Sequence, residues 1–152
     1  MDVLLEHDAD ILLHLGDVGT VEVIDALVTA RAGQTEPIEA HLVFGNTDWD
    51  IQQLGRYARS LGVHVDHPMG RLDYPDGWLA FTHGHDPGLM RAAVDGGARY
   101  LCHGHTHRQS DLRQGATRIV NPGALFRAST YSVAVIDTDS DEVRFYPVGD
   151  RR

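Results

Sequence analysis

Four apolar segments of this chain each end in a glycine-containing loop that carries a side chain suited to binding a metal ion. The loops are Gly16-Asp17, Gly45-Asn46, His83-Gly84 and Gly104-His105-Thr106-His107. They follow apolar runs at residues 11–15, 40–44, 78–81 and 99–102. In α/β proteins, ligand sites form beyond the carboxyl ends of the strands. We therefore expect the four loops to meet at one edge of the fold.

The segments between these runs predict an α/β protein with helices on the outside. Apolar residues recur at helical spacing over residues 21–31 and 49–61, and a third helix is expected over 87–94. Alternation of strands and helices favours parallel strands in the first half. Further strands are expected at 63–65, 71–74, 78–82, 99–102, 109–113, 117–120, 131–137 and 142–147. We expect one domain over residues 1–152, with two sheets packed together.

Charge and composition restrict the kind of partner. The chain carries a formal net charge of −9, which disfavours duplex nucleic acid or an anionic membrane as its main partner. Bound cations reverse the field locally, so a small anionic substrate stays compatible with that charge. The sequence leaves open whether the chain forms a homo-oligomer.

The same sequence favours a cytoplasmic protein. Its one cysteine, Cys102, lies in an apolar run and cannot form an internal disulfide. No apolar stretch approaches the roughly 20 residues that span a bilayer. Residues 1–8 carry acidic groups where a signal peptide would be basic.

The side chains in the four loops match the ligands of two divalent ions. Carboxylate oxygen, amide oxygen and imidazole nitrogen hold such ions, and Asp17 offers two oxygens that suit a bridge. His105 and His107 are two residues apart, so in an extended segment they point to opposite sides, toward different ions. A lone Asn46 or a lone His-x-His would be weak evidence; the ordered set is stronger. His7, His41, His64 and His67 fit no such pattern and are interpreted as ordinary surface or partly buried residues.

The ordered loops resemble the motifs of the calcineurin-like metallophosphoesterase superfamily, in the branch of small bacterial and archaeal phosphodiesterases. The matching segments are Gly16-Asp17, Gly45-Asn46-Thr47-Asp48, His83, Gly104-His105-Thr106-His107 and the later turn Asn121-Pro122-Gly123. The resemblance implies a four-layer α/β/β/α sandwich of two mixed sheets. It also implies hydrolysis of a small phosphodiester by a hydroxide that two divalent ions activate.

Residue by residue, the resemblance implies that Asp17 bridges the two ions. Asn46, His83 and His105 would complete one metal site, and His107 would bind the other ion. The ligand set permits Mn, Fe, Zn, Ni or Co, and Mn is favoured because no thiolate competes.

Two further residues are candidates for chemistry beside the ions. Many members carry a catalytic His after the motif Asn, whereas this chain has Thr47. His85 is therefore our candidate for the general acid, and its alternative interpretation is a loop histidine. Arg108 is a candidate for a charge-assisted contact to phosphate, with a solvated surface arginine as the alternative.

The superfamily's first motif, Asp-x-His at the end of a first strand, has no counterpart here. Residues 1–7 resemble the tail of the helix that follows that strand. We therefore expect a chain that is N-terminally truncated relative to the family, through a misassigned start or a real truncation. A truncated product should bind the second metal poorly and be less stable. The alternative to an active enzyme is a catalytically impaired protein or a non-enzymatic scaffold of the same fold, as the retromer subunit is among eukaryotic proteins.

Overall fold

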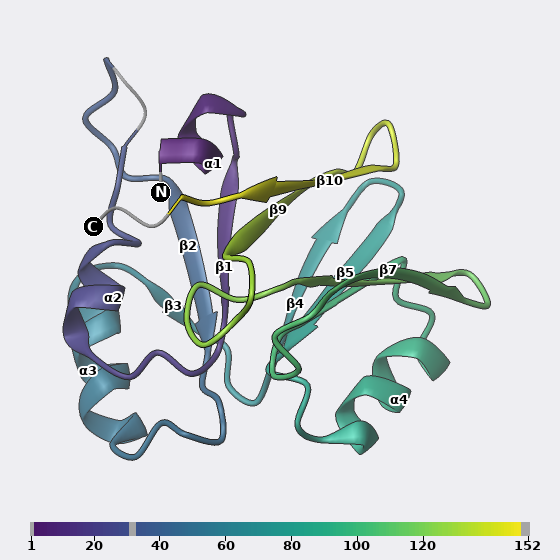
Figure 1. The fold of residues 1–152 in the computed structure, drawn as a ribbon, viewed down its shortest axis with the longest axis horizontal. Coiled ribbons are helices and arrows are strands. Elements are labelled where there is room, and N and C mark those ends of the chain that lie inside the picture. The colour runs from purple at the N-terminus through teal and green to yellow at the C-terminus, as the bar shows by residue number, and fades with distance from the viewer. Residues whose placement is uncertain (1, 31–32, 150–152) are drawn as a thin grey trace.

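The computed structural model describes residues 2–30 and 33–149 and shows an α/β fold (Figure 1). The first half comprises α1 (Asp2–Glu6), β1 (Ile11–Leu15), α2 (Val21–Asp25), β2 (Glu39–Val43), α3 (Ile51–Ser60) and β3 (His64–Val65). The second half comprises β4 (Met69–Tyr74), β5 (Gly77–Thr82), α4 (Pro87–Asp95), β6 (Tyr100–His103), β7 (Gln109–Gln114), β8 (Thr117–Pro122), β9 (Ser132–Asp137) and β10 (Glu142–Pro147). Each expected strand is present, and no bound differs from the expected one by more than two residues.

The strands form two main sheets and a separate ribbon. Strands β1, β2 and β3 form a parallel sheet in that order. The second sheet has the order β4-β5-β6-β8-β7, with parallel central strands and antiparallel edge strands. Strands β9 and β10 pair with each other as a separate antiparallel ribbon. Of the two main sheets, only the larger is therefore mixed.

Three apolar clusters define the layers and confirm the four-layer arrangement. Helices α1, α2 and α3 contribute to a cluster with one face of the parallel sheet, which includes Ile24, Leu42 and Leu54. Residues of both sheets, among them Val43 and Phe81, form a second cluster between them. Helix α4 packs through a third cluster on the outer face of the five-stranded sheet. Burial of apolar surface in these three clusters stabilises the sandwich.

Helix α2 is shorter than the periodicity predicts. The pattern over residues 21–31 indicates one helix, but the helix ends at Asp25. The next turn tightens, with the Leu27 amide donating to the Ile24 carbonyl and the Val28 amide to the Asp25 carbonyl. Leu27 remains buried in this tighter turn, so its helical spacing signals burial rather than continued helix. Residues 31–32 lie outside the described part of the chain.

Helix α3 agrees with the pattern and is capped at both ends. The Asp50 carboxylate accepts a hydrogen bond from the Gln53 amide at 2.9 Å, which satisfies one free amide of the first turn. Gly62, with a φ of 82°, follows its C-terminal end.

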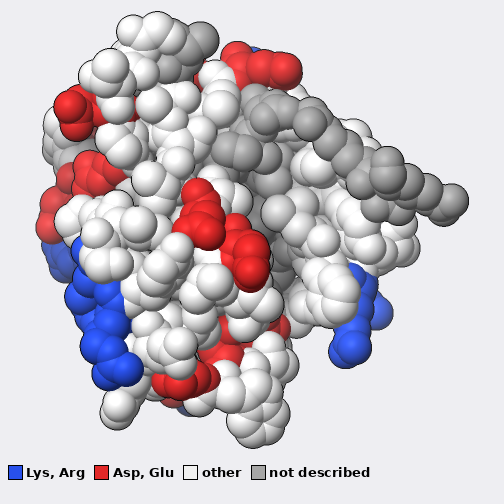
Figure 2. All heavy atoms as spheres, turned by 90° about the vertical axis from the view of Figure 1, so that its left-hand side faces the viewer, with Lys and Arg blue, Asp and Glu red and all other residues white. Residues whose placement is uncertain are grey.

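The surface carries charges of both signs. The side formed by α2 and α3 shows acidic patches beside basic groups (Figure 2). Within residues 2–30 and 33–149, no helix has the length and apolar character to cross a membrane. Cys102 is buried in the core, as predicted, and burial raises the pKa of its thiol to about 12.

Candidate metal centre

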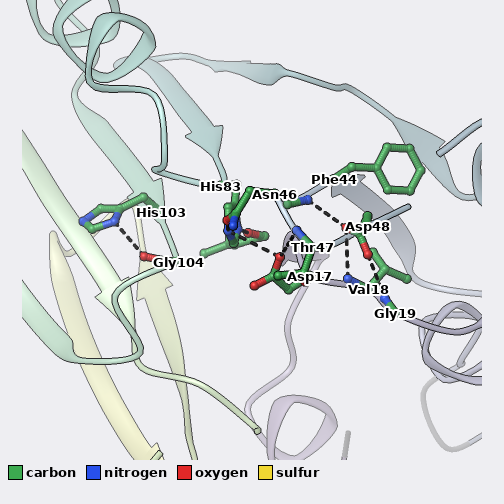
Figure 3. Close-up of polar contacts among 12 residues, drawn as sticks. Asp17, Val18, Gly19, Phe44, Asn46, Thr47, Asp48, His83, His103 and Gly104 are labelled. Atoms are coloured by element: carbon green, nitrogen blue, oxygen red, sulfur yellow. Dashed lines mark hydrogen bonds and ion pairs between the residues drawn. The ribbon is translucent and has the colours of Figure 1, made fainter. Parts of the chain in front are cut away.

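The four predicted loops meet at the carboxyl ends of strands from both main sheets. Asp17 follows β1, Asn46 follows β2, His83 follows β5, and the segment that holds His105 and His107 follows β6. Asp17, Asn46 and His83 lie next to one another, with their polar atoms directed inward (Figure 3).

His83 is the central side chain of this group and is only 2% exposed. Its Nδ1 lies 2.7 Å from the Leu15 carbonyl oxygen. A carbonyl only accepts, so Nδ1 carries the proton and donates it there. Burial is the main cause that lowers the pKa of His83, which keeps the ring neutral. Its Nε2 therefore presents a lone pair to the site.

Two oxygen atoms face that same lone pair. Asn46 Oδ1 is 3.0 Å from His83 Nε2, and Asp17 Oδ1 is 3.5 Å from it. With Nε2 unprotonated, three electron-pair donors converge and no proton is shared among them. A bound cation would accept these three electron pairs. One imidazole nitrogen with two oxygen atoms suits a borderline divalent metal ion.

Asp17 supplies negative charge at this point. Burial acts to raise the pKa of its carboxyl group, but hydrogen bonds from Thr47, together with His83 and His107, lower the pKa below the usual value. The Thr47 amide donates to Asp17 Oδ1 at 3.2 Å. The carboxylate therefore stays ionised and oriented at neutral pH.

The other histidines surround this group. The His83 and His105 rings are 5.1 Å apart, and the His83 and His85 rings are 5.3 Å apart. His107 Nδ1 lies 3.3 Å from the Arg127 carbonyl oxygen, so its Nε2 is also left unprotonated when the ring is neutral. His85 is exposed at the rim, beside His105 at 6.2 Å.

Several candidate ligands have unusual backbone conformations. Asp17, His105 and His107 have φ angles of 55°, 63° and 57°. Left-handed backbone costs an L residue about 1–2 kcal/mol. Such strain concentrates at functional sites, where the surrounding structure holds it in place.

Two glycines allow the loops to approach this closely. A Cβ at Gly45 would lie 2.1 Å from Asp17 Oδ1, and a Cβ at Gly16 would lie 2.5 Å from His83 Nδ1. Neither position accommodates a side chain without displacing a candidate ligand.

Asp48 connects the loops that carry Asp17 and Asn46. Its carboxylate accepts from the amides of Gly45 at 2.7 Å, Val18 at 3.1 Å and Gly19 at 2.8 Å (Figure 3). The motif Gly45-Asn46-Thr47-Asp48 includes Asp48 but does not indicate this role. The tendency of aspartate to accept hydrogen bonds from nearby backbone amides is the signal that points to it. The adjoining Trp49 is 96% exposed.

Asn121 holds the loop that carries His105. The side chain is fully buried, and its Nδ2 donates to the Gly104 carbonyl at 2.8 Å and to the Thr106 hydroxyl at 3.0 Å. Its Oδ1 accepts from the Gly123 amide at 2.9 Å. Hydrogen bonds from Asn121, in the Asn-Pro-Gly turn noted in the sequence, therefore hold the His105 loop in place.

His14 and Arg108 complete the description of the site. Burial lowers the pKa of His14, and the buried Nδ1 has no hydrogen-bond partner within the described residues. The charges of Asp48 and Asp17 act in the opposite direction and raise the pKa of His14, which indicates that the ring lies near these two carboxylates. Arg108 is exposed and directly follows His107.

Comparison with known proteins gives a family match and structural neighbours. Residues 1–141 match the calcineurin-like phosphoesterase superfamily domain. Among curated protein sequences, none matches this chain. An archaeal phosphodiesterase is similar in structure, with a TM-score of 0.81 and 18% identity, over 97% of this chain and 88% of that chain.

Two further solved structures share the fold. The Escherichia coli phosphoesterase YfcE has a TM-score of 0.62 and 18% identity, over 97% of this chain and 89% of its own. A single mutant of Vps29 from Entamoeba histolytica has a TM-score of 0.62 and 18% identity, over 98% and 90% of the two chains. Because the family match covers most of the chain and the fold agrees with it, the chain belongs to the calcineurin-like phosphoesterase superfamily.

Proposed function

We propose that this chain is a metal-dependent phosphodiesterase. The observation that carries the proposal is the unprotonated Nε2 of buried His83, which faces the oxygens of Asn46 and Asp17. The likeness to the archaeal phosphodiesterase and to YfcE supports the fold required for this chemistry.

In this proposal the loops hold two divalent ions. Asp17, Asn46, His83 and His105 would hold the first, while Asp17 and His107 would contact the second. Bound Mn²⁺, or Fe, Zn, Ni or Co in its place, would lower the pKa of a water molecule toward neutrality and offset the phosphate charge. Because fewer described side chains serve the second ion, we expect it to bind more weakly than the first.

His85 and Arg108 would act on the substrate. The exposed His85 imidazole lies beside His83 and His105, where it can donate a proton to the leaving oxygen. The exposed Arg108 guanidinium, next to His107, can donate charge-assisted hydrogen bonds to a phosphate oxygen. The overall negative charge suits a small phosphodiester better than duplex nucleic acid.

The test is hydrolysis of bis-p-nitrophenyl phosphate by the purified chain with and without added Mn²⁺. We expect turnover that depends on Mn²⁺ and is lost in Asp17→Ala and His105→Ala. His7→Ala is the matched control, since His7 is also exposed but stacks on Tyr146 at 4.1 Å, away from the loops. Full activity in the folded Asp17→Ala protein would refute the ligand assignment.

A second candidate is a scaffold of the same fold that binds a protein. The exposed apolar side chains Leu125 and Phe126, in the loop whose Arg127 carbonyl contacts His107, favour it. The vacuolar sorting proteins among the structural neighbours show that this fold is not confined to proteins named as phosphoesterases. Stoichiometric Mn²⁺ binding without any phosphodiester turnover would favour the scaffold over the enzyme.

A further inference from the structure

A second group of imidazoles and carboxylates lies on β2 and β3, outside the candidate metal centre. Glu39 and His41 are two residues apart on β2 and share one face of the strand. His64 on β3 pairs in register with His41, and their rings stack at 4.6 Å. The ligand atoms of Glu39, His41 and His64 all lie within 4.8 Å of one another.

His41 is held between two carboxylates. Its Nδ1 is 2.9 Å from Asp66 Oδ2, and its Nε2 is 2.9 Å from Glu39 Oε1. The ring is buried, whereas Glu39 is exposed. A neutral imidazole has one N–H and can donate to only one of these oxygens. The other contact therefore requires a second positive centre at the ring, either a proton or a metal ion.

The surroundings of His41 favour the metal ion. When Nδ1 donates its proton to Asp66, Nε2 presents a lone pair toward Glu39. Metal-binding histidines almost always donate their other ring N–H to a carboxylate, a backbone carbonyl or water, and Asp66 is placed to accept it here. His64 contributes another imidazole on the same side of the sheet.

We propose that Glu39, His41 and His64 bind a Zn²⁺ ion and that Asp66 orients His41. Zinc takes imidazole nitrogen and carboxylate oxygen, and three protein ligands leave one position for water. The ion would connect β2 to β3, an edge strand of only two residues that pairs with β2 at two register positions. We therefore infer a stabilising role for this site.

The site is spatially distinct from the phosphodiesterase centre. Glu39 begins β2, whereas Asn46 lies beyond its carboxyl end. With a rise of about 3.3 Å per strand residue, Glu39 is about 13 Å from Val43 at the end of the strand. The His41 ring also contacts Phe81 edge-on at 5.8 Å, which directs it into the space between the sheets.

The test titrates Zn²⁺ into a background variant that lacks two proposed ligands of the other centre, His83→Ala/His105→Ala. Isothermal titration calorimetry should show one Zn²⁺ per chain in this background. Adding His64→Ala should weaken that binding by at least 100-fold, whereas adding His7→Ala, the control, should leave it unchanged. Adding Asp66→Asn should weaken it by about 10–100-fold, because Asp66 orients a ligand without binding the ion.

Thermal unfolding supplies an independent measurement in a His105→Ala background. Saturating Zn²⁺ should raise the unfolding midpoint of His105→Ala more than that of His64→Ala/His105→Ala. Circular dichroism before titration selects variants that retain the fold. Equal Zn²⁺ affinity with and without His64 in folded protein would overturn the proposal. Because the readouts are binding and stability, failure here leaves the phosphodiesterase proposal intact.

Discussion

The two ends of strand β6 have opposite electrostatic character. At its amino end, the Tyr100 hydroxyl donates to Asp141 at 2.6 Å, and Arg118 makes two hydrogen bonds to Asp111 at 2.8 and 2.7 Å. Arg118 and Arg113 also bond to Asp141. Beyond its carboxyl end, imidazoles and oxygens face one another as electron-pair donors. One end is paired within the protein, whereas we propose that the other binds a cation.

The pKa values reflect this contrast. The Tyr100 hydroxyl and then the neighbouring arginines hold the pKa of Asp141 to about 2. Burial, followed by Asp141, raises the pKa of Tyr100 to about 12. At the other end, His105 and His107 hold left-handed backbone conformations, a feature that concentrates at functional sites. We infer that the amino end stabilises the fold and that the carboxyl end provides the chemistry.

The largest expected effect is that of Gly45→Ala at the carboxyl end. A methyl group there would overlap Asp17 Oδ1, so the Asp17 loop must move. We expect Mn²⁺-dependent hydrolysis to fall at least 100-fold, with about 1–3 kcal/mol lost in the free energy of unfolding. Gly149→Ala is the control, because a Cβ there meets no atom within 4 Å. Wild-type activity in Gly45→Ala would show that this loop is not positioned for catalysis.

Arg118→Ala, at the amino end of β6, should lower stability but leave activity unchanged. Removal of the half-buried guanidinium leaves Asp111 and Asp141 without their shared partner. We expect a loss of about 1–3 kcal/mol in urea unfolding, while kcat of the folded protein stays unchanged. Arg144→Ala, which removes an exposed pair with Glu142, should change the free energy of unfolding much less than Arg118→Ala does. If Arg118→Ala is as stable as Arg144→Ala, the inference that the amino end of β6 stabilises the fold is wrong.

Tyr100→Phe should have the smallest effect, and one that depends on pH. The folded pKa of Asp141 lies below its unfolded value, so its stabilisation is present above about pH 4 and is lost as pH falls toward 2. The folded pKa of Tyr100 lies above its unfolded value, so its stabilisation is lost as pH rises from about 10 to 12. The difference in unfolding free energy between wild type and Tyr100→Phe should be largest between these limits. A difference that does not vary with pH would exclude the Tyr100–Asp141 hydrogen bond as its source.

The strands and the convergence of the four loops could be predicted because a buried strand requires a run of apolar residues, which is visible in the sequence. An apolar run that ends in glycine and a polar ligand type, as at Gly16-Asp17, marks both a strand end and a site. The early end of α2 could not be predicted, because Leu27 is buried in a tight turn as well as in a helix.

The His41 cluster could not be predicted for a different reason. Glu39 and His41 meet His64 only through the register of β2 with β3. That register depends on how two segments more than 20 residues apart pair. Taken singly in the sequence, His41 and His64 give no sign of these neighbours, and each has the pattern of an ordinary surface or partly buried residue. The role of Asp48 was hidden similarly, since two of its three amide donors come from the distant Asp17 loop.

The exposure of Trp49 makes the candidate centre observable by its own fluorescence. Its indole is almost fully exposed, and Trp49 directly follows Asp48, whose carboxylate connects the two ligand loops. Trp78, the other tryptophan, is half-buried beneath the Arg71 guanidinium at 4.3 Å and should emit at a shorter wavelength. Emission at the red edge of the spectrum therefore comes mainly from Trp49 and reports on the Asn46 loop. Metal binding at the candidate centre can then be followed without a dye or a label.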